Sequence, residues 1–175
     1  MEINELYQRK GKNGVIDILL AMKKVVLDND KWDKDRITKE TAKNITKDRE
    51  PRDEIGIISD IFHWVKTNVK YYRDIKGKEE ITYPYLTLQA IRDNRNFYSS
   101  DCDDIAVLLS ALLRSIGFRT RLEVVALRIP QYNHARCSVY SETLNKWLTL
   151  EGTSKSSKVG DAFPSRLAIL MVEVS

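Results

Sequence analysis

The chain has few metal-binding side chains and lacks the paired spacing that structural zinc sites use. Its 175 residues include two cysteines and two histidines, and neither cysteine belongs to a CxxC pair. Closed zinc sites take their ligands from paired motifs such as CxxC, and these four residues fall in no such spacing. We therefore do not expect a structural zinc site.

Long apolar segments are also absent. The N-terminal residues MEINELYQRKGK are not followed by the apolar stretch of a secretory signal. No later run of the sequence approaches the roughly eighteen apolar residues of a membrane-spanning helix. We therefore expect a cytoplasmic protein with free thiols and no membrane partner.

A large excess of positive or of negative charge is absent too. The 29 basic and 25 acidic residues leave a formal net charge of +4, and the two signs are mixed along most of the chain. Nucleic-acid binding needs a focused basic face, so we do not expect a nucleic-acid partner. A basic surface remains one alternative, and it would consist of Arg114, Arg119, Arg121 and Arg128.

Length and composition predict one globular domain. Hydrophobic residues make up 42% and charged residues 31% of the chain, a balance typical of a folded domain with one core. We divide this single domain, residues 1–175, into an N-terminal helical part, a core and a C-terminal loop and strand. These parts cover residues 1–54, 55–153 and 154–175.

Helical patterns come first along the chain, and strand-like patterns follow. Apolar spacings of three and four predict helices over 14–28, 53–69 and 102–116, with shorter helices from about Thr38 and over 86–92. Segments rich in β-branched and aliphatic residues predict strands over 121–127, 134–140, 146–151 and 167–174. The charge-dense segment 28–53 is predicted to form a solvated surface. This order favours an α+β fold with an antiparallel sheet.

Cys102 stands at the start of the most apolar predicted helix. Ser100 and Asp101 precede it as capping residues, and Asp103 and Asp104 follow in the first turn. Free backbone amides and the positive end of the helix dipole favour a thiolate there and offer donors to a developing oxyanion. The flanking aspartates oppose the thiolate, so a nearby base would be needed to activate Cys102. A small buried residue at a helix start is the alternative interpretation.

A β-hairpin would bring a histidine beside an acid. If HARCSVYSETLNKWLTLE turns at a two-residue tip, Glu142 and Thr143, then His134 lies directly opposite Glu151. A carboxylate beside an imidazole holds the ring in one tautomer and stabilises its protonated form, as in a catalytic triad. An ordinary ion pair on a solvated face is the alternative interpretation.

The second thiol falls on the opposite face of this hairpin. Cys137 shares its face with the apolar residues Ala135, Val139, Leu148 and Leu150, whereas His134 lies on the other face. We therefore predict that Cys137 is an inert packing residue. The same orientation disfavours a disulfide between Cys102 and Cys137.

The other histidine lies in the helix predicted over 53–69. The apolar stripe of that helix consists of Ile55, Ile58, Phe62, Val65 and Val69. At about 100° per residue, His63 falls roughly opposite the centre of this stripe. We therefore predict that His63 faces solvent and takes no part in catalysis.

The cysteine, histidine and acid segments resemble those of the transglutaminase-like superfamily of papain-like thiol enzymes, of the small prokaryotic or phage type. In that family a cysteine opens a helix within a GDCDD-type pattern, a strand beginning with histidine follows, and a later strand ends with an acid. The matching text is DCDDIAVLLSALLRSIGFRTRLEVV, then HARCSVY, then KWLTLEGT. With IFHWVKTNVKYYRD and YPYLTL upstream, the resemblance covers residues 55–153.

The resemblance implies a papain-like core in which the catalytic helix packs on an antiparallel sheet. It implies that Cys102 is the nucleophile, His134 the general base and acid, and Glu151 the orienting acid. The implied chemistry is acyl transfer on an amide bond of a peptide or protein, either hydrolysis or crosslinking, with no cofactor and no metal. Two positions depart from the family: Ser100 replaces a usual glycine, and Glu151 replaces the commoner aspartate.

Two alternatives remain open within this interpretation. A second oxyanion donor, beside the backbone amide of Cys102, could come from Tyr98 or Gln89, although a packing aromatic and a surface amide are the simpler interpretations of these residues. For the whole chain, the second hypothesis is a catalytically inactive binding or assembly module with the same fold.

Overall fold

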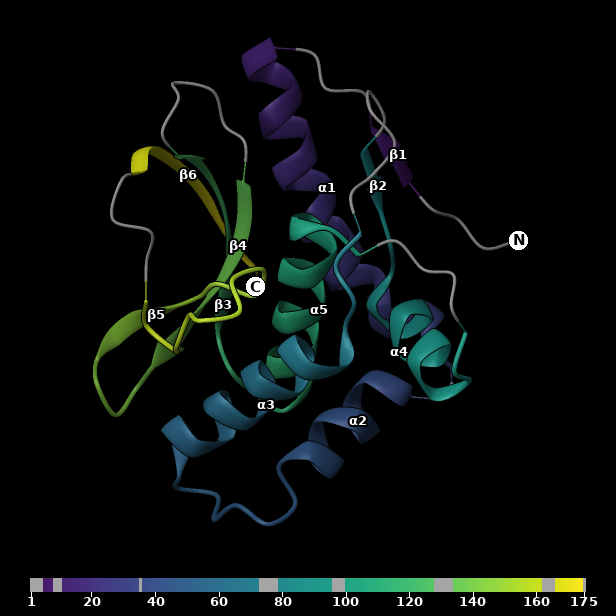
Figure 1. Cartoon of the computed structure of the whole chain (residues 1–175), viewed down its shortest axis with the longest axis vertical. Helices are drawn as coiled ribbons and strands as arrows, with labels where there is room; N and C mark the ends of the chain where they lie inside the picture. The colour runs from purple at the N-terminus through teal and green to yellow at the C-terminus, as the bar shows by residue number, and fades with distance from the viewer. Residues whose placement is uncertain are drawn as a thin grey trace.

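A computed structural model describes residues 5–7, 11–34, 36–72, 79–95, 100–127, 134–161 and 166–174. Within these ranges, five helices lie beside a four-stranded antiparallel sheet (Figure 1). The helices are α1 (Gly11–Trp32), α2 (Ile37–Ile45), α3 (Glu54–Asn68), α4 (Pro84–Arg92) and α5 (Cys102–Ser115). The sheet has the order β5-β4-β3-β6 and consists of β3 (Thr120–Leu127), β4 (His134–Ser141), β5 (Lys146–Leu150) and β6 (Arg166–Val174). The predicted α+β class is confirmed.

Two short strands were not predicted. β1 (Glu5–Tyr7) and β2 (Glu79–Ile81) pair in antiparallel fashion as a separate two-stranded sheet. Three residues are too few to display an alternating pattern, so this pairing leaves no periodic signal in the sequence. The predicted connection between α3 and α5 therefore contains a strand as well as the expected short helix α4.

Helix α1 is 22 residues long and extends beyond the predicted range 14–28 at both ends. Met22, Val25 and Val26 on its inner face are buried, whereas Leu20 and Leu27 on its outer face are exposed. Lysines and aspartates interrupt the apolar residues along its outer side. Among the described helices, none combines the length and the apolar character needed to cross a lipid bilayer.

The charge-dense segment after α1 is not only a solvated surface. Asp33 is buried, and its carboxylate accepts hydrogen bonds of 2.8 Å from the backbone N–H groups of Ile37 and Thr38. These are two of the amides that the start of α2 leaves without helical partners. The buried side chain of Asn29 also donates to Thr38 Oγ1 at 2.9 Å. The prediction of a wholly solvated segment is therefore wrong, because its polar groups satisfy a helix start inside the fold.

Helix α5 lies at the centre of the fold. Its residues from Asp103 to Leu113 are all buried, and it contacts β4, β3 and the four other helices. As predicted, the helix ends just before Gly117, whose φ of 101° suits glycine. The chain reverses there into β3. Since β4 is antiparallel to β3, α5 and β4 run in the same direction.

The β4–β5 hairpin differs from the predicted register by two residues. Ser141 pairs with Lys146 and Cys137 pairs with Leu150, so the tip holds residues 142–145. Asn145 adopts a φ of 49° at the end of this tip. Glu54 of α3 accepts hydrogen bonds of 2.8 Å from the backbone N–H groups of residues 142 and 143, which fixes the wider turn.

The predicted faces of the hairpin residues are correct although the predicted register is wrong. Because side chains alternate along a strand, a shift of two residues leaves every side chain on its predicted face. The residues predicted to face the core are buried there: Ala135, Cys137, Val139, Leu148 and Leu150. That part of the prediction is confirmed.

Gly152 packs closely on the central helix. A Cβ atom at this position would lie 2.3 Å from Cγ2 of Ile105 and 3.3 Å from Cδ1 of Leu109. Both side chains are buried in the core. The segment that follows β5 therefore contacts α5 through its backbone, and only glycine leaves room for this contact.

We expect Gly152→Ala to lower the free energy of unfolding by about 1–3 kcal/mol, because the added methyl group overpacks a rigid core. Urea denaturation monitored by far-ultraviolet circular dichroism would measure this loss. Lys155→Ala, in the exposed part of the same segment, is the matched control and should leave the midpoint unchanged. Equal midpoints for Gly152→Ala and the parent protein would contradict the close approach.

Candidate active site

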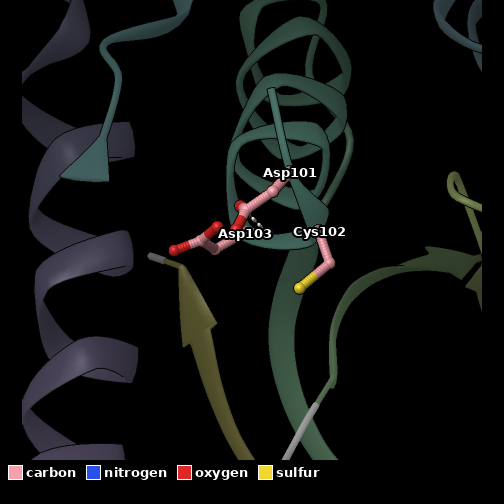
Figure 2. Close-up of side chains that lie close together, drawn as sticks. All are labelled: Asp101, Cys102 and Asp103. Atoms are coloured by element: carbon pink, nitrogen blue, oxygen red, sulfur yellow. Dashed lines mark hydrogen bonds between the residues drawn. The ribbon is translucent and has the colours of Figure 1, made fainter. Parts of the chain in front are cut away.

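Cys102 is the first residue of α5 and is half-buried (Figure 2). Asp101 is the N-cap, and its carboxylate accepts a hydrogen bond of 3.3 Å from the backbone N–H of Asp103. The hydroxyl of Ser100 is buried and has no hydrogen-bond partner within the described residues. The predicted capping is therefore confirmed for Asp101 and wrong for Ser100.

Two carboxylates stand close to the thiol. One carboxylate oxygen from Asp101, one from Asp103 and the Cys102 sulfur all lie within 4.8 Å of one another. Figure 2 shows all three side chains grouped at the first turn of α5. Negative charge at this distance disfavours a thiolate, whereas the helix start favours one. The structure places the carboxylates close to the thiol, as the prediction assumed. The need for a base to activate Cys102 stays a prediction.

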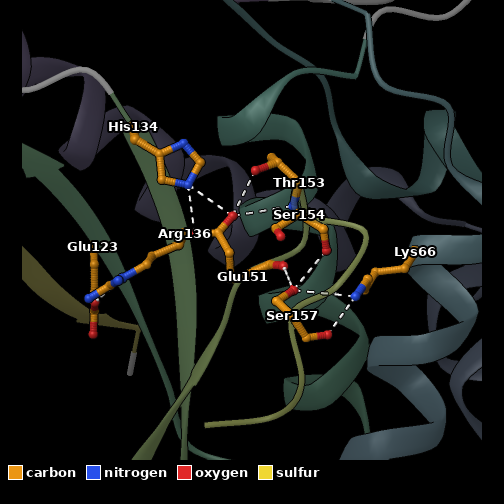
Figure 3. A network of polar contacts seen from close by, with 8 residues as sticks. All are labelled: Lys66, Glu123, His134, Arg136, Glu151, Thr153, Ser154 and Ser157. Carbon is orange, nitrogen blue, oxygen red and sulfur yellow. Dashed lines mark hydrogen bonds and ion pairs between the residues drawn. The ribbon is translucent and has the colours of Figure 1, made fainter. Parts of the chain in front are cut away.

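His134 and Glu151 form a close pair (Figure 3). His134 Nε2 lies 2.8 Å from Oε2 and 3.0 Å from Oε1 of Glu151. The side chain of Glu151 is 2% exposed and that of His134 is 11% exposed. An ion pair on a solvated face is therefore excluded. Nε2 is therefore the ring nitrogen that contacts Glu151, and Nδ1 lies on the other side of the ring.

The pair is diagonal across the hairpin rather than directly opposed. Extending the observed register from Cys137 and Leu150 places Arg136 opposite Glu151 and His134 opposite Thr153. Diagonal neighbours in an antiparallel sheet stand about 7–8 Å apart, a distance that long side chains bridge. The prediction of direct opposition is wrong, and the extra methylene of glutamate, compared with aspartate, suits the longer reach.

Three residues that the sequence did not single out hold Glu151 in place (Figure 3). Thr153 donates to Glu151 Oε1 from its hydroxyl at 2.7 Å and from its backbone N–H at 3.3 Å. Ser157 Oγ donates to the backbone carbonyl of Glu151 at 2.6 Å. Lys66 Nζ, on α3, donates to the backbone carbonyl of Ser157 at 2.6 Å. The acid is thus anchored through its side chain, its backbone and the segment that follows it.

This environment keeps Glu151 ionised. Burial by itself would raise the pKa of its carboxyl group, but the hydrogen bond and charge of His134, together with the hydrogen bonds from Thr153, hold the pKa below its ordinary value. Burial also lowers the pKa of the Lys66 ammonium, partly offset by the charges of Asp161 and Glu151. A carboxylate that is charged, buried and hydrogen-bonded can orient an imidazole and stabilise its protonated form.

The pair lies toward the end of α5 that carries the cysteine. Gly152, next to Glu151, lies against Ile105, one helical turn from Cys102. Independently, Ser110 Oγ lies 2.6 Å from Thr120 Oγ1, and Thr120 pairs with Val139. Helix α5 extends about 12 Å from Ser110 back to Cys102. Strand β4 extends about 17 Å from Val139 back to His134. The first residues of α5 and β4 therefore lie toward the same end of the packed pair.

The second thiol and the second histidine lie where they were predicted. Cys137 is 0% exposed, and burial raises the pKa of its thiol well above the usual range. Neither Cys102 nor Cys137 is in a disulfide. His63 is exposed on α3. The predicted core position of Cys137 and the solvent-facing position of His63 are confirmed.

The outer face of β3 and β4 carries a buried ion pair that sequence reasoning missed. Arg136 Nε lies 2.7 Å from Glu123 Oε2, and both side chains are 0% exposed. Ser138 Oγ also donates to Glu123 at 2.6 Å. Burial raises the pKa of Glu123, but these hydrogen bonds and the arginine charges lower it below its ordinary value. Charged residues on neighbouring strands are usually exposed to solvent, so the local sequence did not indicate that Arg136 and Glu123 are buried.

The other candidate residues of the sequence have different outcomes. Tyr98 and Arg128 lie outside the described residues. Gln89 is half-buried on α4 and stays a prediction as an oxyanion donor. Arg119 and Arg121 of the alternative basic surface lie 3.0 Å from Glu173 and 2.8 Å from Glu123, so their charges are paired.

Most of the sequence also matches a known family. The profile of the transglutaminase-like superfamily matches residues 39–152. The chain belongs to the transglutaminase-like superfamily. This confirms the resemblance seen in the cysteine, histidine and acid segments, and the match begins earlier, in α2, than the predicted start at residue 55. A search of curated proteins finds no match.

Solved structures share the transglutaminase-like fold at low sequence identity. Calcium-bound LapG from Legionella pneumophila has a TM-score of 0.54 and 19% identity over 72% of this chain and 68% of LapG. A candidate protease from Parabacteroides distasonis has a TM-score of 0.50 and 13% identity over 78% of this chain and 27% of its own. Rad4, from the Rad4/XPC nucleotide excision repair complex, has a TM-score of 0.52 and 12% identity over 91% of this chain and 46% of its own. At these identities the likeness shows the fold alone.

The described carboxylates beside Cys102 do not by themselves form a calcium site. Calcium takes six to eight oxygen ligands, whereas the described cluster offers two carboxylates and a sulfur. Those carboxylates already accept hydrogen bonds from the first-turn amides of residues 103 and 104. Helix capping thus uses one oxygen of each carboxylate.

We expect Glu151→Gln to lower the free energy of unfolding by about 1–2 kcal/mol at neutral pH, because it removes a charged hydrogen bond to His134. The folded pKa of Glu151 lies below its ordinary value of 4.5. Its contribution is therefore fully present above about pH 5 and is lost as pH falls through the folded pKa. Urea denaturation at several pH values would measure the difference between parent and variant.

The matched control for this measurement is Glu142→Gln, at the exposed tip of the hairpin. This variant should track the parent protein at every pH. A stability difference for Glu151→Gln that stays constant between pH 7 and pH 3 would contradict an ionised, stabilising Glu151.

Proposed function

We propose that this transglutaminase-like protein is a cysteine-dependent enzyme that transfers acyl groups from amide bonds of peptides or proteins. Family membership and fold support a thiol peptidase-like function. The observation that carries the finer proposal is the close pair of the half-buried His134 and the buried Glu151, toward the end of the fold where Cys102 begins α5. Cys102 would be the nucleophile, His134 the base and acid, and Glu151 the orienting carboxylate.

The proposed first half-reaction uses these three groups in order. His134 Nδ1 accepts the proton of the Cys102 thiol, and the sulfur forms a bond to the amide carbonyl carbon. Glu151 stays ionised and stabilises the protonated imidazole through Nε2. The tetrahedral oxyanion forms near the backbone N–H of Cys102 at the positive end of α5. The carbon–nitrogen bond then breaks, and His134 returns the proton to the leaving amine.

The second half-reaction decides the product. Water attacks the thioester carbonyl carbon while His134 takes a proton from that water. The carbon–sulfur bond then breaks, and the Cys102 sulfur recovers the proton from His134. A second amine in place of water would give a crosslink by the same steps. The buried position of Glu151 supports either outcome, since it keeps the imidazole oriented in both half-reactions.

We expect iodoacetamide to label Cys102 at least about tenfold faster than Cys137 at neutral pH, because one thiol is half-buried at a helix start and the other is fully buried. His134→Ala should slow the labelling of Cys102 by roughly tenfold, because it removes the base. Mass spectrometry of tryptic peptides over a time course would give both rates.

The other histidine of the chain supplies the matched control. His63→Ala removes an exposed imidazole on α3 and should leave the labelling rate of Cys102 unchanged. Equally slow labelling of both cysteines, or no effect of His134→Ala, would contradict the enzyme proposal. Either result would instead favour the second hypothesis, an inactive binding or assembly module.

A further inference from the structure

A groove of about 670 Å³ lies outside the proposed triad, between α3, the tip of the β4–β5 hairpin and residues 157–161. None of the three triad residues lines it. Its apolar lining residues are Ile55, Phe62, Leu144, Leu148 and Val159. Its charged and titratable lining residues are His63, Lys66, Lys146, Lys158 and Asp161. The groove therefore combines an apolar floor with an excess of basic side chains.

Two of these basic groups are available to a ligand. Lys66 is engaged within the fold, because its ammonium donates to the backbone carbonyls of residues 155 and 157, and the charge of Asp161 acts on it. Lys146 and Lys158 are exposed, and within the described residues their ammonium groups form no ion pair. Asp161 in the lining accepts from the backbone N–H of Lys158 at 2.8 Å, so one carboxylate faces three lysines and the lining keeps an excess of positive charge.

The apolar part of the groove suits aliphatic side chains better than nucleic-acid bases. Leu144 is 47% exposed at the hairpin tip, where its backbone N–H donates to Ser141 Oγ at 3.0 Å. Phe62 is buried, and the ammonium of Lys66 lies 4.9 Å from its ring centroid. A covered ring offers no stacking platform, which base binding to single strands requires. An exposed leucine beside unpaired lysines instead fits a peptide with apolar and acidic side chains.

We propose that this groove binds an acidic, extended segment of a protein substrate. Carboxylates of that segment pair with Lys146 and Lys158, and its apolar side chains lie against Leu144, Leu148 and Val159. The groove adjoins the segment that begins at Glu151, since Ser157 in its lining donates to the Glu151 carbonyl. That the bound segment belongs to a substrate rests on the proposed function, whereas the binding itself does not.

Fluorescence anisotropy with a defined peptide tests the binding. The probe is a fluorescein-labelled dodecapeptide containing six glutamates, two leucines, one phenylalanine and three glycines, titrated with the full chain at low and high salt. We expect Lys146→Glu combined with Lys158→Glu to weaken binding about tenfold, because two attractive contacts become repulsive. Lys39→Glu combined with Lys43→Glu makes the same change of charge on the exposed side of α2 and should alter binding less than twofold.

A second variant separates charge from folding. Leu144→Ser removes an exposed apolar side chain, so it should weaken binding several-fold and leave the unfolding midpoint unchanged. No binding of the peptide by the parent protein, or equal losses in the two lysine pairs, would overturn the proposal. Tighter binding of a labelled single-stranded DNA than of the peptide, lost on mutation of Lys146 and Lys158, would also overturn it.

The outcome is independent of the catalytic test. Lys146 and Lys158 lie outside the triad, so their double variant should keep the labelling rate of Cys102 by iodoacetamide. Peptide binding without selective labelling would refute the enzyme proposal and support the groove. Selective labelling of Cys102 without peptide binding would support the enzyme proposal and refute the groove.

Discussion

The structure depends on a helix that is buried on every side. Helix α5 places the residues from Asp103 to Leu113 out of contact with water, so its first backbone amides cannot rely on solvent for hydrogen bonds. Aspartates within and before the first turn accept from these amides. Asp104 in addition accepts from the backbone N–H of Thr82, ahead of α4, at 2.7 Å. The acidic surroundings of Cys102 are therefore a condition for burying the helix that carries it.

The aspartates that cap α5 also affect the chemistry of the Cys102 thiol. Carboxylates that stabilise the helix start also stand near the sulfur and disfavour its negative charge. In the proposed mechanism the thiol therefore needs a partner that takes its proton. The half-buried His134 and the buried Glu151 lie toward the same end of the fold. The capping of α5 and the burial of Glu151 are thus linked requirements of one proposed site.

Glu151 in turn depends on elements far from it in the sequence. Lys66 on α3 holds the backbone at Ser157, 91 positions further along the chain, and Ser157 holds the backbone at Glu151. Glu54, at the start of the same helix, fixes the hairpin turn through residues 142 and 143. Helix α3 therefore positions both ends of β5, and the groove along α3 shares this support with the proposed site.

Local sequence patterns were enough to predict the five helices, the four strands of the main sheet and the residue types of the proposed site. Apolar spacing predicted α5, the capping aspartate placed Cys102 at its start, and alternation assigned the faces of β4 and β5, because each of these depends on neighbours within a few residues. The folded structure was needed to reveal the hairpin register, the burial of the Arg136–Glu123 pair, and the anchoring of Glu151 by Thr153, Ser157 and Lys66. Turn length, burial and anchoring depend on contacts with distant segments, and local periodicity carries no information about which distant segment will supply them.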